Sequence, residues 1–292
     1  MISQAELTAL QAPAKDDGYY LVPAPSPVGD LAEASLAEAS LAEAASLLRL
    51  KVPELNRILG VGQPVPLSRV ATSEEAALIG EGLRRLGIET VTVPHIDLHL
   101  EESAKKIRAL ELAGDSLTAV PTSGVDKVTA RLDEVTLVVA GRLLLNRQET
   151  EERKRRGRKQ TVDSRQLSRD ESVLDLYVKS DEVNWRINAN NFDFSCLGSA
   201  KAMTTFENFA ALSSLLRGRA TNAQFDDSYN QARPALATVW PVEPQTRKGE
   251  WRRSGAGKFD VATVTMTDNE AQFTRYSRLR QCLRLRELIN RK

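Results

Sequence analysis

The chain has 292 residues, 41% of them hydrophobic and 27% charged, which is typical of globular proteins and long enough for two domains. Its net charge is only +1, but residues 1–152 carry 14 Lys/Arg and 23 Asp/Glu, whereas residues 153–292 carry 26 and 16, so the two parts have net charges of −9 and +10. Two cysteines exclude a disulfide framework and are too few for a cysteine-based structural zinc site.

No segment approaches the ~18 consecutive apolar residues of a membrane-spanning helix. The first residues also lack the basic and apolar regions of a secretory signal. We therefore expect a cytoplasmic protein in which residues 1–17 are a flexible N-terminus. The pentapeptide LAEAS then occurs twice from residue 31, and we interpret it as a duplication at the start of a helix, because a five-residue period does not keep one helical face.

The elements expected next alternate between strands and helices. Residues 19–25 predict a strand, 30–50 and 53–60 two helices, and 65–71 a second strand. Residues 72–87 predict a helix, because a Ser/Thr cap precedes paired Glu and Ala76, Ile79 and Leu83 follow at helical spacing. Residues 88–94 predict a third strand, so the order is βααβαβ.

The run "LAEAASLLRLKVPELNRILGVGQPVPLSRVATSEEAALIGEGLRRLGIETVTV" combines two helices joined by a tight turn, a P-V crossing strand, an S-E-E-A helix start and an L-G-I-E turn. With these features, residues ~19–95 resemble the C-terminal domain of the bacterial ribosomal stalk protein, whose fold is similar to that of the Clp protease adaptor. The resemblance implies a module at residues 18–100 that binds proteins rather than converting a substrate. Its expected partner surface is the turn at 52–62, with Val52, Leu55 and Arg57.

Residues 104–240 contain several β-rich runs followed by an amphipathic helix at 204–220. This order weakly resembles a pleckstrin-homology-like barrel over residues ~105–220. We therefore expect an α+β protein, in which the stalk-like domain is followed by an antiparallel β-barrel-like domain with a closing helix. Residues 241–268 are polar and rich in Pro and Gly, which predicts an extended linker. The expected apolar stripe of the closing helix consists of Phe206, Phe209, Leu212, Leu215 and Leu216.

No catalytic constellation emerges from the sequence. His95, Asp97 and His99 form an H-x-D-x-H pattern at the end of a predicted strand, where we favour solvated histidines over a metal site. Cys196 has no histidine nearby in sequence, and the alternating apolar residues around it predict a buried strand, which favours a structural thiol over a nucleophile. We therefore predict a protein that is not an enzyme, with no cofactor and no metal.

A basic run occupies residues 153–159, between two predicted strands, and we expect it to be a long, mobile hairpin loop. It could contact the phosphates of nucleic acid or of an anionic lipid, or remain solvated and partly neutralised by Glu149, Glu151 and Glu152. The candidate phosphate-binding residues are Arg153, Lys154, Arg155, Arg156, Arg158 and Lys159.

Residues 269–292 predict a basic amphipathic helix. Such a helix can dock on a membrane surface, on RNA or in the groove of a partner. It can also pack within its own chain, with its arginines against the acidic N-terminal half, and the charge asymmetry slightly favours this alternative. The candidate partner-binding residues are Phe273, Tyr276, Arg278, Arg280, Leu283 and Arg284.

The leading hypothesis from sequence is a non-catalytic adaptor or regulatory protein of the cytosol. Its partner, another protein, would bind at the 52–62 turn and the C-terminal helix. The alternative hypothesis is binding to nucleic acid or to an anionic membrane surface through residues 153–159 and the C-terminal helix.

Overall fold

One long β-hairpin organises the fold, because hydrophobic cores lie against both of its faces. The computed structural model describes residues 17–24, 38–123, 126–155, 158–179, 184–255 and 258–290. Within these ranges the side chains of residues 151–163, 248–262 and 290 are not described. The expected flexible N-terminus (except residue 17) and the first LAEAS copy lie outside the described residues.

The N-terminal module has the βααβαβ order that the sequence predicts. Its three strands form an antiparallel sheet in the order β2-β1-β3. The last helix begins at the predicted cap, where the Thr72 hydroxyl accepts a hydrogen bond from the Glu75 amide at 3.2 Å. The elements are β1 (Tyr19–Pro23), α2 (Glu38–Leu47), α3 (Val52–Leu59), β2 (Ser68–Val70), α4 (Ser73–Arg85) and β3 (Thr90–Pro94).

The second sheet is a curled, mixed half-barrel with the strand order β11-β12-β7-β8-β9-β4-β5-β6. The α+β class is as expected, but the expectation of an antiparallel barrel is wrong, because β4 runs parallel to β9 and β10 runs parallel to β7. Most of its strands precede the helix α5: β4 (Lys105–Ala113), β5 (Ser116–Pro121), β6 (Val128–Arg131), β7 (Val135–Arg155), β8 (Arg158–Val178) and β9 (Trp185–Asn188).

Helix α5 (Thr205–Arg219) covers one face of this sheet, and β10 (Gln224–Asp226) follows it. Leu212 and Leu216 are fully buried, as the predicted stripe requires, but Phe206 is 68% exposed. Phe206 lies in the first turn of the helix, outside the packed face. The sequence therefore predicts the closing helix correctly but makes its apolar stripe one turn too long.

The side chains of β7 and β8 alternate between two cores. Leu137 and Tyr177 belong to a first core with the N-terminal module, α6 (Tyr229–Leu236) and α7 (Glu270–Asn290). Val138 and Leu176 belong to a second core with β4, β5, β6, β9 and α5. A strand buried on both faces is apolar at consecutive positions, which explains the run of apolar residues at 137–140. The core of the N-terminal module is therefore continuous with the C-terminal helix.

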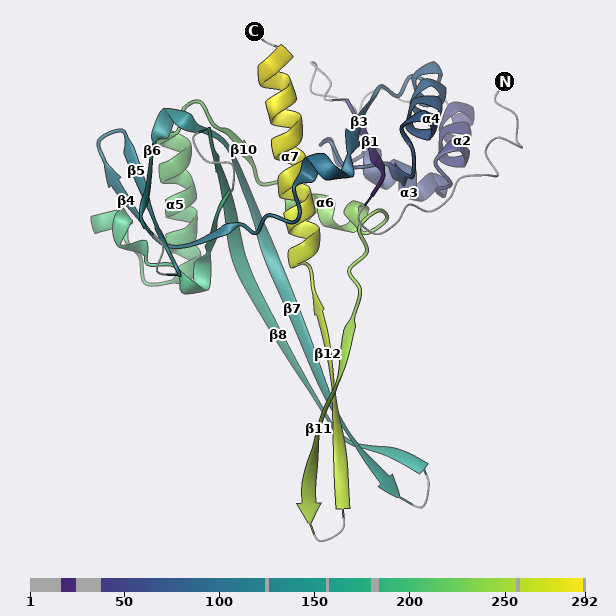
Figure 1. The fold of residues 1–292 in the computed structure, drawn as a ribbon, viewed down its shortest axis with the longest axis vertical. Coiled ribbons are helices and arrows are strands. Elements are labelled where there is room, and N and C mark those ends of the chain that lie inside the picture. The colour runs from purple at the N-terminus through teal and green to yellow at the C-terminus, as the bar shows by residue number, and fades with distance from the viewer. Residues whose placement is uncertain are drawn as a thin grey trace.

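Beyond the two cores, β7 and β8 continue together with β11 (Gln245–Gly255) and β12 (Lys258–Asp268) as a projecting four-stranded arm (Figure 1). The prediction of a linker at 241–268 is therefore wrong over most of its length. The Val/Thr-rich sequence at 261–267 favours a strand, and β12 gains its pairing from β7, from Asp268↔Leu145 to Asp260↔Arg153. The expectation of a long loop at 153–159 is wrong as well, because the β7–β8 ladder continues to Arg155↔Arg158.

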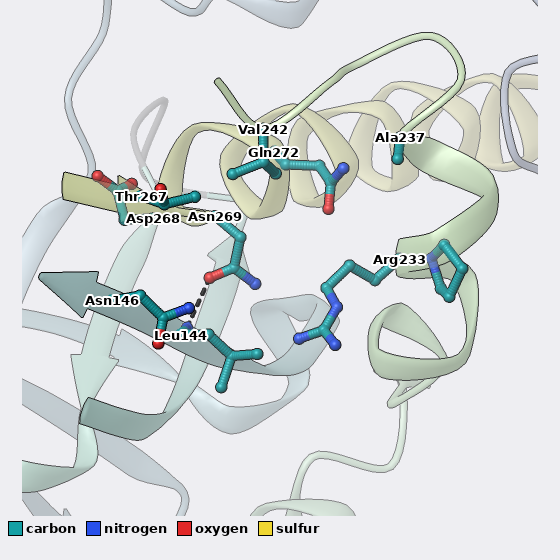
Figure 2. Close-up of a pocket in the computed structure, with 10 residues that line it drawn as sticks. Leu144, Asn146, Arg233, Ala237, Val242, Thr267, Asp268, Asn269 and Gln272 are labelled. Carbon is teal, nitrogen blue, oxygen red and sulfur yellow. Dashed lines mark hydrogen bonds between the residues drawn. The ribbon is translucent and has the colours of Figure 1, made fainter. Parts of the chain in front are cut away.

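Different partners cover successive stretches of one edge of β7. β10 pairs with residues 137–139, and β12 pairs with residues 145–153. Between them, the Asn230 side chain accepts the Arg142 amide at 3.0 Å, and the Asn269 side chain accepts the Leu144 amide at 2.6 Å (Figure 2). Asn269 also donates to the Arg142 carbonyl at 3.0 Å. These asparagines satisfy backbone groups that no strand reaches at the root of the arm.

Gly141 allows the two helices to approach β7 at this root. A Cβ at this position would lie 2.7 Å from Phe273 Cε2 and 2.8 Å from Tyr229 Cδ1. Both rings are fully buried and pack edge to face with centroids 5.0 Å apart, so neither can move aside easily.

We predict that Gly141→Ala lowers the free energy of unfolding by about 1–3 kcal/mol, because it overpacks this contact. Urea unfolding followed by circular dichroism measures the effect. The matched control is Gly218→Ala in α5, where nothing lies within 4 Å of the new methyl group and helix propensity favours alanine. A neutral Gly141→Ala variant would contradict the close packing of α7 on β7.

Candidate functional site

The C-terminal helix α7 packs its apolar stripe inside the protein. Phe273 and Tyr276 are fully buried and Leu283 is 5% exposed, all in the first core. Figure 1 shows α7 between the N-terminal module and the half-barrel. The stripe is therefore not a surface available to a partner in this structure, and the sequence-based alternative of packing within the chain is the arrangement observed.

Buried ion pairs hold α7 in this position. Arg280 lies 2.6 Å from Asp226 of β10, with side-chain exposures of 7% and 1%. The Tyr276 hydroxyl donates to the same carboxylate at 2.8 Å. Burial, followed by the nearby Asp226 charge, raises the pKa of Tyr276 well above its usual value. Asp226 therefore serves two partners on consecutive turns of the helix.

A second buried pair links the half-barrel to the start of α7. Arg186 of β9 donates to both carboxylate oxygens of Asp175 of β8, at 2.7 and 2.8 Å. Its guanidinium also stacks over the Phe273 ring at 5.1 Å and donates to the Thr274 hydroxyl at 3.0 Å. The Arg186 guanidinium loses its hydrogen bonds to water on burial, and these protein partners replace most of them.

Other arginines of α7 contact the acidic N-terminal half. Arg278 donates to the Glu102 carbonyl at 3.0 Å, and Arg286 lies 3.2 Å from the Asp97 carboxylate. Arg284 pairs within the helix with Glu287 at 3.2 Å. Among the described residues, only Arg286–Asp97 pairs α7 with a carboxylate of the acidic half, whereas Arg280 and Arg284 pair with Asp226 and Glu287 of the basic half, so the expected charge pairing between the halves is observed in part.

The turn expected to bind a partner is only partly exposed. Leu55 is fully buried in the first core, and Val52 is half-buried against it. Arg57 is exposed. Helix α3 thus uses its apolar face to pack within the protein, and of the three predicted residues only Arg57 is freely accessible.

The histidines and cysteines do not assemble into a shared site. His95 is buried, with Nδ1 2.8 Å from the Tyr20 hydroxyl, whereas His99 is exposed at a positive φ and lies 3.6 Å from Glu101. Cys196 lies in a 3₁₀ segment rather than the expected strand. Burial raises the pKa of the Cys196 thiol and of the Cys282 thiol, which disfavours the reactive thiolate in both.

The arm brings two basic segments to the same end of the molecule. β7 carries residues 153–155 and β8 carries residues 158–159 at the outer ends of these strands, with Lys154↔Lys159 as a facing pair. Arg156 lies outside the described residues. The neighbouring hairpin carries Arg247, Lys248, Arg252, Arg253 and Lys258 against Glu250 over residues 247–258.

The second basic segment is missed when 241–268 is interpreted as a linker, although counting its charges would find it. Register ties it to the first, because Asp260 of β12 pairs with Arg153 of β7. Nearly a hundred residues thus separate two basic runs that the sheet places together.

Nearer the root, the charges of the arm are paired. Arg142 lies 3.0 Å from Asp170, and Arg147 lies 2.5 Å from Glu149. These side chains are about half exposed, so each pair contributes little to stability. Within each pair the carboxylate still cancels the charge of the arginine. The unbalanced positive charge of the arm therefore lies in the sequence of its outer part.

The comparisons with known proteins find no match: no family model, curated protein or solved structure is significantly similar to this chain. Among the described residues, no helix is long and apolar enough to cross a membrane.

We predict that Asp226→Ala lowers the free energy of unfolding by about 3–5 kcal/mol, because it leaves Arg280 buried without its counter-charge. The double variant Asp226→Ala with Arg280→Met should recover part of this loss. Asp227→Ala is the matched control, since its side chain is 75% exposed and should change stability by less than about 0.5 kcal/mol. Equal effects of the two single substitutions would argue against the buried pair.

The buried tyrosines predict the response to alkali. Burial raises the pKa values of Tyr20, Tyr177, Tyr229 and Tyr276 above the model-compound value of 10.0. A raised native pKa gives stability that is complete below the unfolded-state pKa and is lost as the pH rises beyond it. We expect the free energy of unfolding to fall above pH ~10, with the tyrosinate absorbance of these four residues appearing only as the protein unfolds. Because the chain has five tyrosines, absorbance of more than one tyrosinate near pH 10 with intact circular dichroism would contradict this.

Proposed function

We propose that the protein binds nucleic acid through the basic end of its arm. The observation that supports this proposal is the convergence of residues 153–159 and 247–258 at one end of a four-stranded projection. Together these runs contain eleven Lys or Arg residues and one acidic residue. Basic side chains that contact phosphates release condensed counterions, and this release drives sequence-independent binding.

The shape of the arm is consistent with this partner. From Arg142 to Arg155, β7 extends on the order of 45 Å at ~3.3 Å per residue. The arm can thus carry its charge to a duplex while the two cores remain outside it.

The composition of the tip favours nucleic acid over an anionic membrane. Residues 149–160 contain no apolar side chain, whereas peripheral membrane binding usually combines basic charge with buried apolar area. Trp251 and Phe259 lie in the strands of the second hairpin. Aromatic residues of this kind stack on bases but also insert into membrane interfaces, so the preference for nucleic acid rests on the first hairpin.

The adaptor hypothesis takes second place. The apolar stripe of α7 and Leu55 of α3, on which it depends, are buried within the chain. Arg57 alone would remain as an accessible contact.

We predict that the triple variant Arg153→Gln, Lys154→Gln, Arg155→Gln weakens binding to a 20-base-pair DNA or RNA duplex at least ten-fold at 0.1 M salt. Each lost phosphate contact also reduces the slope of log K against log salt by about 0.9, so three contacts reduce it by about 2–3. Fluorescence anisotropy over a salt series measures both quantities.

The matched control removes three arginines elsewhere: Arg57→Gln, Arg84→Gln, Arg85→Gln. Each variant loses three positive charges, so the two have the same net charge. The three control residues are exposed and lie outside the arm, so their substitution leaves the arm unchanged. We expect less than a two-fold loss of affinity for it. Equal losses in the two variants would indicate nonspecific attraction to the whole protein. Binding to phosphatidylserine vesicles in the absence of duplex binding would overturn the proposal in favour of a membrane surface.

A further inference from the structure

A cleft of about 580 Å³ lies where the N-terminal module, the half-barrel and α7 meet. One wall is formed by α7, and the others are formed by the 3₁₀ turn η1 (His95–Leu98) with the residues after it, the start of β7 and the end of β8. Its volume falls in the range of small-molecule sites, which often occur at such junctions. The lining residues with charge are Asp97, Glu102, Lys179, Arg278 and Arg286.

Arg278 is the unusual member of this lining. The residue is 3% exposed, yet it makes no ion pair with any residue in the described parts of the chain. Among the described residues, its one hydrogen bond goes from Nη2 to the uncharged Glu102 carbonyl at 3.0 Å. Its buried Nε makes no hydrogen bond, but neither does Nε of Arg280 or Arg284, so the missing carboxylate is what distinguishes Arg278. A buried guanidinium without a counter-charge is costly, and neighbouring arginines of α7 avoid this cost by pairing with carboxylates.

The other charged groups that face the cleft do not neutralise Arg278. The Asp97 carboxylate pairs with Arg286 at 3.2 Å, and the Glu102 carboxylate lies 3.8 Å from His99 Nδ1. Lys179, at the end of β8, adds an exposed ammonium group. With His99 neutral, the lining carries three cations (Lys179, Arg278 and Arg286) and two carboxylates (Asp97 and Glu102), so the cleft has a net charge of +1, with Arg278 at its buried wall and Lys179 at its rim.

Apolar groups complete the cleft. Val178 is 5% exposed, Cys282 is half-buried, and Leu285 is 46% exposed. A ligand that fits would thus combine an anionic end with an apolar body, since a bare inorganic ion would leave these side chains uncovered.

We propose that this cleft binds a small organic anion whose carboxylate or phosphate group pairs with Arg278. The planar guanidinium matches either oxyanion through two parallel hydrogen bonds. Lys179 adds attraction from the rim, and the apolar wall contacts the body of the ligand. This site is independent of nucleic-acid binding by the arm.

The test is the thermal unfolding of the full chain with benzoate, with phenyl phosphate and with neutral benzyl alcohol, each at the same ionic strength set by chloride. At a ten-fold excess over Kd, we expect a saturable rise in Tm of about 2–4 °C with at least one anion and none with benzyl alcohol. The two anions distinguish a carboxylate ligand from a phosphate ligand.

The variant Arg278→Met should abolish this rise while leaving Tm in ligand-free buffer equal or higher, because it removes a buried unpaired charge. Lys179→Gln, at an exposed position, should weaken the apparent affinity for the anion about three-fold or more. This variant tests the proposal if Arg278→Met does not fold. Arg284→Gln, on the same helix but outside the cleft, should keep the wild-type response. The proposal is overturned if neither anion raises Tm more than chloride does, if benzyl alcohol acts equally, or if Arg278→Met and Lys179→Gln both respond as wild type.

Discussion

Strand β7 is the element on which the rest of the structure depends. Its two faces belong to different hydrophobic cores, through residues such as Leu137 and Val138, and its outer half carries the arm. Because β7 is buried on both faces in its first half and projects beyond the cores in its second half, its sequence must be apolar near its start and polar near its end. The sequence shows this change between Leu145 and Asn146, at the point where β12 begins to pair with β7. The arm thus begins where the cores no longer cover the ribbon.

Helix α7 is the second shared element, since it contacts β7 while its ion pairs reach β10 and the N-terminal half. Its many arginines could suggest a surface for an external polyanion, but most of them have specific partners inside the protein. Arg280 has Asp226, Arg286 has Asp97, and Arg284 has Glu287. Formal charge in a sequence therefore does not measure available charge, because buried pairing removes part of it.

Local signals predicted the parts of the fold that local interactions determine. The Thr72 cap of α4 and the helical spacing of apolar residues in α4 and α7 gave correct helices, because caps and helical spacing act over a few residues. The arm was missed because β11 has no apolar alternation; its pairing comes from β12, and that of β12 comes from β7, more than a hundred residues earlier. The core in which the α7 stripe packs, and the lack of an ion pair for Arg278 among the described residues, also depend on contacts between distant segments. The spacing of residues in the sequence does not reveal such contacts.

The two proposed sites differ in how closely they are tied to the fold. Side chains on α7 serve the cores, the root of the arm and the cleft at once: Asn269 binds the β7 backbone, Phe273 packs on Gly141, and Arg278 lines the cleft. A substitution on this helix can therefore change several properties together. Neither of the two cores, as far as the structure describes them, includes a residue of the outer arm, so a charge removed there leaves both cores intact. A loss of nucleic-acid binding at the arm consequently identifies a contact, whereas the same loss from α7 would first require proof that the arm is still anchored.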